Sequence, residues 1–423
     1  MPDAPTWLQA LWPHHHWTIL LLTIIITTYL AIVRHLRYRR QIAITSPFTH
    51  KQRPLSSMTT QEAHSIITQL QQLEFPYAFN KARRIALLKA GGIPTMSKLF
   101  AATGQNNKRN SGKRAVDTEI LLREAQAMPR ESQRYMMAVA RMNYLHAHYR
   151  KSNKITPRDL LHTLGDGLTE ILTVINRDEW RKLSDVEICA LGIFHKNLGE
   201  DMDIPFYPLS SSEEGWRDGV HFAMELRDWT LRYEEDVARP VETNDRYVRV
   251  YVDGAVGRFP GFVRVLVRKV LAAGLDERMR GSLCLEPPGP ILLFVLGCIR
   301  ETRKAFLRYL SLPRVSPVRM VHEMADPKTN RYYFDRKGLQ PWYMEPSFWS
   351  RWGPGALVVR ALGGKVPGAY GDRYQPQGYD LMTIGPEPQK DRGAEEMKID
   401  MEVMRARAVA TCPFSHAKAG GFR

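Results

Sequence analysis

The stretch RMNYLHAHYR contains two histidines, His146 and His148, and imidazole is a common metal ligand. Residues 130–149 predict a helix, because Pro129 ends the preceding helical pattern. Residues two apart on a helix point about 200° away from each other, so the pair could not bind one metal ion together. His146 points inward, since it shares a face with the residues Val139, Met142 and Tyr149. It is therefore a candidate cofactor ligand, with a core histidine hydrogen-bonded to a neighbour as the commoner alternative.

Polar residues on two predicted helices are further candidates. Arg150 follows His146 by one turn and could reach an anionic group of a cofactor held there. In KRAVDTEILL, Arg114 and Thr118 are four residues apart and Asp117 is adjacent, so we expect all three to project toward one site. The alternative for this trio is an ordinary polar network on the surface.

His162, in DLLHTLGDG, is a second candidate for cofactor binding. It lies off the leucine stripe of its predicted helix, on the face of Gly165 and Asp166. Glycine weakens a helix interior, and the close approach of a flat ligand or a neighbouring helix would explain it there. The sequence contains neither HExxH nor GxSxG, nor the glycine-rich loop before a ligating cysteine that is typical of cytochromes P450.

The composition of the chain favours a membrane over nucleic acid as its partner. The 423 residues carry a net charge of +16, but lysine and arginine are widely spread and accompany no nucleic-acid motif. An anionic lipid surface would attract the same charge. The four cysteines form no CxxC pair, which indicates neither a zinc knuckle nor a disulfide framework.

Residues 17–33, WTILLLTIIITTYLAIV, are uncharged and about long enough to cross a bilayer as a helix. Arg34, Arg37, Arg39 and Arg40 follow, whereas residues 1–16 contain neither lysine nor arginine. The positive-inside rule therefore predicts a single-pass anchor with a lumenal tail over 1–16 and a cytosolic C-terminal part. A cleaved signal peptide is the alternative, but it would need a basic start and a small-residue cleavage site.

Helical patterns dominate the remaining chain. We expect a basic linker over 34–58, an all-α domain over 59–336, and a Gly/Pro/aromatic-rich region over 337–423 that packs on the domain or the membrane surface. Capping signals predict helix starts at Thr59, Thr156 and Ser184. The run ILLFVLGCI, residues 291–299, is too short to span a bilayer and is expected in the buried core.

Motifs along nearly the whole chain resemble the MpaB-type family of endoplasmic-reticulum-bound oxygenases of mycophenolic acid biosynthesis, which belongs with the rubber oxygenases or latex-clearing proteins. In order they include QLEFPYAF, GIPTMSKLFAATGQ, KRAVDTEILL, RMNYLHAHYR, EWRKLSDVEICALG, LRYLSLPR, PSFWSRWGP and VPGAYGDRYQPQGY. The resemblance implies a globin-like, all-α protein that binds haem b and uses O2 to cleave carbon–carbon double bonds in isoprenoid chains.

The resemblance also implies roles for individual residues. The proximal haem ligand of the family lies in an HAxxR-like motif, which HAHYR places on His146, with Arg150 near a haem propionate. A distal arginine and threonine of the family fall on Arg114 and Thr118. Asp117 stands where those enzymes have a lysine, which removes a possible sixth ligand of the haem iron.

Together these observations predict a haem-dependent oxygenase of the endoplasmic reticulum membrane that cleaves a C=C bond in a prenyl or terpenoid side chain during secondary metabolism. Its expected partners are O2, a prenylated small molecule and membrane lipid. One alternative is a non-catalytic helical membrane scaffold that has lost the cofactor. Another is an enzyme of the same fold that performs hydroxylation or desaturation.

Overall fold

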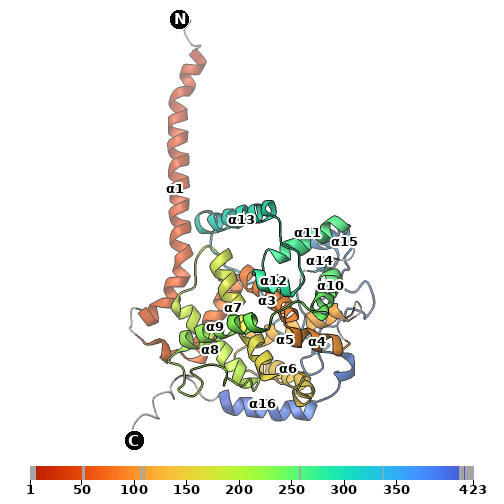
Figure 1. Ribbon diagram of the computed structural model, residues 1–423. Helices are drawn as coiled ribbons and strands as arrows, with labels where there is room; N and C mark the ends of the chain where they lie inside the picture. The colour runs from red at the N-terminus through yellow and green to blue at the C-terminus, as the bar shows by residue number, and fades with distance from the viewer. Residues whose placement is uncertain are drawn as a thin grey trace.

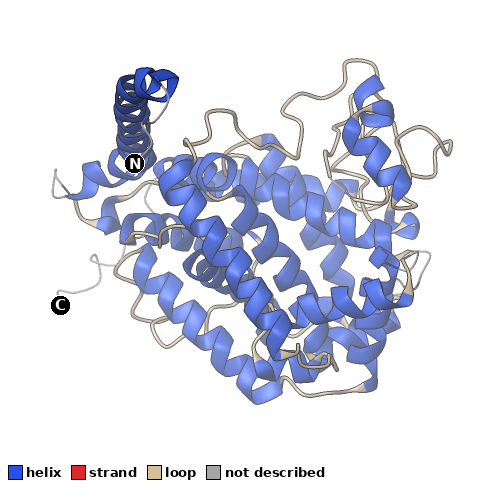
Figure 2. Ribbon diagram, turned by 90° about the horizontal axis from the view of Figure 1, so that it is seen from above, coloured by secondary structure: helices blue, strands red, loops and turns tan. Residues whose placement is uncertain are grey.

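The computed structural model describes residues 6–49, 53–104, 107, 110–256, 259–336, 338–408 and 414. In these ranges the chain forms helices and isolated β-bridges but no strand (Figure 2). A long N-terminal helix, α1 (Thr6–Thr49), projects from a body made of the other helices (Figure 1). The predicted all-α class is confirmed.

The helices of the body follow one another up to α13, with a long connection over residues 202–218 between α8 and α9, and a longer irregular segment precedes α14. In chain order they are α2 (Thr60–Gln69), α3 (Pro76–Lys89), α4 (Pro94–Ala102), α5 (Ser111–Ala127), α6 (Gln133–Lys151), α7 (Pro157–Asp178), α8 (Asp185–Asp201), α9 (Gly219–Val237), α10 (Glu242–Val256), α11 (Gly261–Ala272), α12 (Glu277–Ser282), α13 (Pro290–Ala305) with the π-helical turn η4 (Phe306–Leu310), α14 (Phe348–Trp352), α15 (Pro354–Ala361) and α16 (Ala394–Ala408).

Helix α1 is longer than the predicted anchor. Its segment from His16 to Thr49 is apolar and long enough to cross a membrane. The large apolar side chains between Trp17 and Ile32 are exposed, whereas Val33 is buried against the body. Residues 34–49, expected as a linker, continue the helix, because this part of α1 packs on η4 and α8.

Local capping determines where several helices begin. Thr59 and Ser184 each accept a hydrogen bond from the backbone three residues later, and the glutamate at that position bonds back to the cap. Thr156 forms the same box with Asp159. The predicted starts of α2, α7 and α8 are confirmed. The sequence could show them because both partners of each capping box lie within one helical turn.

Helix α7 forms the centre of the body. It packs against α3, α8 and α9, and its predicted apolar stripe is buried: Leu161, Leu164, Leu168, Ile171, Leu172 and Ile175. Burial of such side chains contributes about 1.5–3 kcal/mol each to folding. The residues of α7 beside this stripe can therefore be held rigidly against neighbouring helices.

Two predictions about apolar segments have different outcomes. The run 291–299 lies in α13, which has no buried residue, so its assignment to the core is wrong. In the C-terminal region Trp342, Tyr343 and Tyr379 are buried, and α16 packs on α6. Phe348, Trp349 and Trp352 are exposed instead. Some aromatic residues of this region therefore pack in the core, and others lie on the protein surface.

Candidate functional site

A cavity of about 310 Å³ lies inside the body between α3, α5, α6, α7, α8 and α10. Most of its lining is apolar, which suits an apolar ligand positioned by a few polar groups. Three of the residues singled out in the sequence line it: Arg114, Thr118 and His146. The structure thus brings together residues of α5 and α6 that are about thirty positions apart in the chain.

The ring of His146 lies on the cavity wall, and the residue as a whole is half-buried. Burial lowers its pKa to about 4, and the positive charges of Arg150 and Arg114 act in the same direction. The imidazole is therefore neutral at physiological pH, the form that ligates metals. Neither ring nitrogen has a hydrogen-bond partner among the described residues. A core histidine would have such a partner, so the geometry favours a ligand of the cavity.

A second neutral histidine, His195 of α8, lines the same cavity. Its Nδ1 donates to the carbonyl of Leu191 at 2.7 Å, so Nε2 carries the free lone pair. This Nε2 faces Gly167 of α7, 3.9 Å from where a Cβ there would lie. Burial lowers the pKa of His195 to about 4. His195 was not singled out in the sequence, although its place between Leu191 and Leu198, four residues before it and three after, indicates an inward face.

Arg114 brings a positive charge to the cavity wall. Its guanidinium lies 4.1 Å from the ring centre of Phe100, and no carboxylate bonds to it among the described residues. Burial lowers the pKa of Arg114, and no carboxylate is among the groups that oppose this effect. Thr118 donates its hydroxyl proton to the carbonyl of Arg114 at 3.0 Å. Thr118 therefore presents lone pairs, and not a donor, to the cavity.

Arg83 of α3 is a second cation in the lining and was not singled out in the sequence. Its Nη2 bonds to the Oε1 of Gln126, but its buried Nη1 has no partner in the described structure. Burial lowers its pKa to about 9, and the charge of Arg123 adds to this effect. A buried guanidinium with a vacant donor favours an anionic group nearby.

Asp117 does not join Arg114 and Thr118 at the cavity. On α5 it lies about 100° around the axis from Thr118. It accepts hydrogen bonds from Lys113 Nζ at 2.8 Å and from Tyr343 Oη at 2.6 Å. Its expected projection toward the site is corrected, since these partners hold it on the side of α5 that faces the C-terminal region.

Arg150 and His162 also lie outside the cavity lining. Arg150 donates to the carbonyls of Met202 and Asp203 at 3.0 and 2.7 Å, which ties α6 to the end of α8. His162 is fully buried and its Nε2 lies 3.0 Å from Glu234 Oε1. The structure thus shows both side chains bonded to other parts of the protein, and their contact with a cofactor stays a prediction.

A buried ionic cluster borders the cavity at Asp166. Lys89 Nζ lies 2.9 Å from Asp166 and from Glu170, and 2.8 Å from Glu234. Burial raises the pKa of Asp166 to about 7 despite the attraction of Lys89. His162 completes the cluster through Glu234. One lysine thus faces three carboxylates, so the carboxyl group of Asp166 can bind or release a proton beside the cavity.

Comparison with known proteins identifies the family. The chain is 34% identical over 389 residues to the ER-bound oxygenase mpaB' of Penicillium brevicompactum, covering 91% of this chain and 92% of that protein. The chain is 33% identical over 373 residues to the ER-bound oxygenase mpaB of the same organism, covering 88% and 87%. The chain belongs to the MpaB family of ER-bound oxygenases.

A third MpaB protein, the ER-bound oxygenase mpaB of Penicillium roqueforti (strain FM164), is 40% identical over 212 residues, which are 50% of this chain and 71% of that protein. No family model matches the sequence. Membership of the MpaB family makes this chain an oxygenase. The apolar helix α1 agrees with the membrane association that the names of these MpaB relatives state.

Proposed function

We propose that this oxygenase binds haem b in the cavity, where His146 would hold the iron, and cleaves a C=C bond in a prenyl or terpenoid side chain. The observation that carries the proposal is the state of His146. It is a neutral imidazole on the wall of an apolar cavity, and its nitrogens have no partner among the described residues. Iron of haem is commonly held by such a histidine.

The cations of the lining fit the two carboxylates of haem b. Arg83 has a vacant buried donor and Arg114 lacks a carboxylate partner in the described structure. Either could bind a propionate, a role that the family resemblance implies for Arg150, whose Nη1 and Nη2 donate to backbone carbonyls. The bound haem would supply the binding and activation of O2.

The protein's own residues would then bind and orient the substrate. The apolar lining excludes water and accommodates a hydrocarbon chain: Phe79, Leu121, Leu122, Leu145, Leu160 and Phe194. N–H groups of Arg114 would stabilise negative charge that develops at the reacting atoms. Asp166, with a pKa of about 7, would hold or release a proton at the edge of the same space.

The proposal places the body in the cytosol and the N-terminus in the lumen of the endoplasmic reticulum. The basic residues that follow the apolar part of α1, beginning with Arg34, support this direction by the positive-inside rule. A prenylated substrate partitions into lipid, so an anchored enzyme would meet it at the membrane.

Product analysis tests the function. The purified full chain in detergent is incubated with O2 and a panel of prenylated phenolic and terpenoid compounds, and products are identified by mass spectrometry. Cleavage predicts a shortened carbonyl product with wild type and with His148→Ala, which alters an exposed residue of the same helix. His146→Ala should lose at least about 100-fold in rate, because the axial ligand is removed.

The other outcomes separate the alternatives. A product with one added oxygen and an intact carbon skeleton would replace cleavage by hydroxylation. A product that has only lost two hydrogens would indicate desaturation. Full activity of His146→Ala would remove the basis of the proposal.

A further inference from the structure

Large apolar side chains are exposed on α11, α13, α14 and α15. On α13, Ile291 is 80% exposed and Phe294 72%. Figure 1 shows α11, α13, α14 and α15 at the end of the body from which the apolar part of α1 emerges. We call this surface the platform; its other exposed apolar residues are Phe262, Val265, Leu266, Val270, Leu293, Val295, Ile299, Phe348, Trp349, Trp352, Leu357 and Val358. A surface on which this many large apolar side chains are exposed marks an interaction site.

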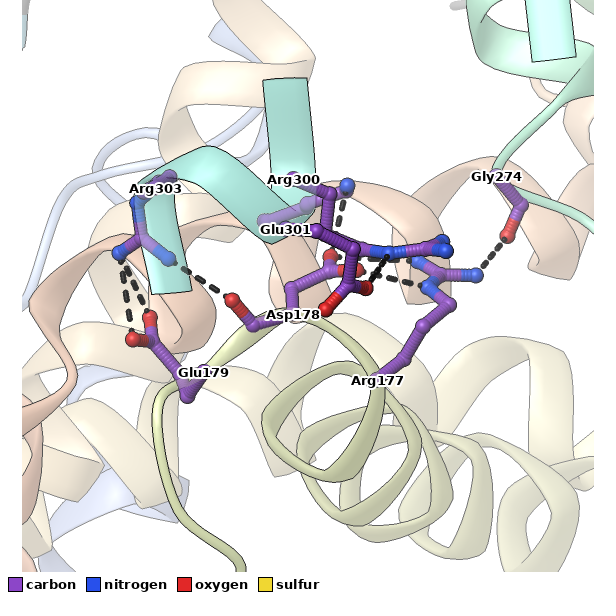
Figure 3. Close-up of polar contacts among 8 residues, drawn as sticks. Arg177, Asp178, Glu179, Gly274, Arg300, Glu301 and Arg303 are labelled. Atoms are coloured by element: carbon purple, nitrogen blue, oxygen red, sulfur yellow. Dashed lines mark hydrogen bonds and ion pairs between the residues drawn. The ribbon is translucent and has the colours of Figure 1, made fainter. Parts of the chain in front are cut away.

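Helix α13 is attached to the body by its polar residues. Arg303 pairs with Glu179 at 2.9 Å and donates to the carbonyl of Asp178 at 2.8 Å (Figure 3). Arg177 at the end of α7 donates to the carbonyl of Gly274, which follows α11 (Figure 3). These bonds hold α13, and the chain that follows α11, on the body. The apolar residues of the two helices therefore face away from the body. The exposure of these residues is therefore built into the fold.

The platform lies level with the apolar part of α1. Tyr29, within the uncharged stretch, donates from its hydroxyl to the carbonyl of Leu310 at 2.7 Å, and Arg37 donates to that of Leu307 at 2.7 Å. Tyr29 precedes Arg34, the first charge after the stretch, by five residues, or about 7 Å of helix. Amphipathic helices enter the interfacial layer of a bilayer by about 5–10 Å, which matches this overlap.

The charge of the platform suits anionic lipid. Its helices carry one acidic residue, Glu301, which is paired with Arg300 and Lys304. Basic residues outnumber it on these helices: Arg264, Arg268, Lys269, Arg300, Lys304, Arg351 and Arg360. Basic residues among aromatic and aliphatic ones are typical of helices that lie in a membrane surface.

We propose that the platform is a second membrane contact, which seats the body in the interfacial layer of an anionic phospholipid bilayer beside the anchor α1. Continuity with α1 selects lipid as the occupant, since any bilayer crossed by the apolar part of α1 reaches the platform. The seating would fix the rotation of the body about the axis of α1, which a single membrane-spanning helix leaves open. This inference does not depend on the cofactor or the reaction.

Lipid-quenching measurements on the full chain test the platform. The exposed Cys284 and Cys298, together with Cys412, are replaced by serine. Single cysteines are then introduced by Phe294→Cys, Trp349→Cys or, as the matched control, Ile399→Cys. Ile399 is 67% exposed but lies on α16, at the opposite end of the body (Figure 1). Each protein is labelled with a polarity-sensitive fluorophore and reconstituted in vesicles of phosphatidylcholine and phosphatidylserine.

The labels at 294 and 349 should be quenched several-fold more than the label at 399 by lipids with a spin label on the acyl chain. They should be quenched several-fold less by iodide in the water. Equal quenching at the three positions would overturn the proposal. Labels at 294 and 349 that are protected from iodide but not quenched by lipid would also overturn it, because a protein would then cover the platform.

Discussion

Replacing Lys89 by methionine tests whether the buried cluster beside the cavity is balanced as the distances indicate. Lys89 is 2% exposed and is the lysine that contacts Asp166, Glu170 and Glu234 within 2.9 Å. Removing one partner of a buried ion pair costs about 3–5 kcal/mol, because the remaining charge is left without compensation. Lys89→Met should therefore lower the free energy of unfolding by about this amount at pH 8.

The loss should be smaller at pH 6. Burial already raises the pKa of Asp166 to about 7, and removal of Lys89 would raise it further. A carboxyl whose pKa is raised by folding binds more protons in the folded state, so its contribution to stability falls as pH rises toward the folded pKa. Protonation at pH 6 would relieve part of the repulsion among the three carboxylates.

Urea unfolding of the full chain in detergent, followed by circular dichroism at pH 6 and pH 8, measures both effects. The control is Lys81→Met. Lys81 lies 2.8 Å from Asp178, and the lysine side chain is 33% exposed. That pair should contribute only about 0–1 kcal/mol. If Lys89→Met were as stable as Lys81→Met at both pH values, the assignment of a tightly coupled buried cluster would be wrong.

Three further variants test other parts of the site and the fold. His195→Gln should reduce acid sensitivity, because the pKa of His195 is about 4 when folded against 6.5 for the free group, so this residue alone contributes a loss of about 3 kcal/mol as pH drops from 6.5 to 4. The variant keeps the similar contribution of His146 and should therefore lose about 3 kcal/mol less than wild type when unfolding is measured across that range. Arg83→Met should cost about 1–3 kcal/mol, since it removes only the bond to Gln126, but should weaken haem retention during dilution in detergent; unchanged retention would exclude a propionate partner. Ser184→Ala should cost about 1 kcal/mol through loss of the capping box of α8, measured by urea unfolding, while Ser211→Ala serves as a non-cap control.

The sequence predicted the features that depend on neighbours within a turn or two. The capping box of Thr59 with Glu62 is local, and so is the inward direction of His146 on α6. The position of Asp117 depends on Tyr343, which is 226 residues away, so helical spacing could not reveal it. The pairing of Nδ1 in His195 is local, but the cavity that its Nε2 faces is formed by several helices.

Apolar composition alone did not show whether a segment is buried in the core or exposed on the surface of the protein. Residues 291–299 have the composition of a core segment, yet α13 is held by Arg303 with its apolar residues outward. The linker expected over 34–58 was assigned from its charge and its Pro and Ser content, whereas contacts with η4 and α8 keep residues 34–49 helical. In both cases the deciding contacts are with distant parts of the chain.

The absorption spectrum of the purified full chain tests the central claim most directly, when recorded for wild type, His148→Ala and His146→Ala at equal protein concentration. We predict a haem Soret band in wild type and His148→Ala, and its loss or displacement in His146→Ala with lower haem content. A wild-type protein without a haem band after expression with sufficient iron and haem precursor, or a His146→Ala protein with an unchanged band and full haem content, would contradict the assignment of His146 as the axial ligand.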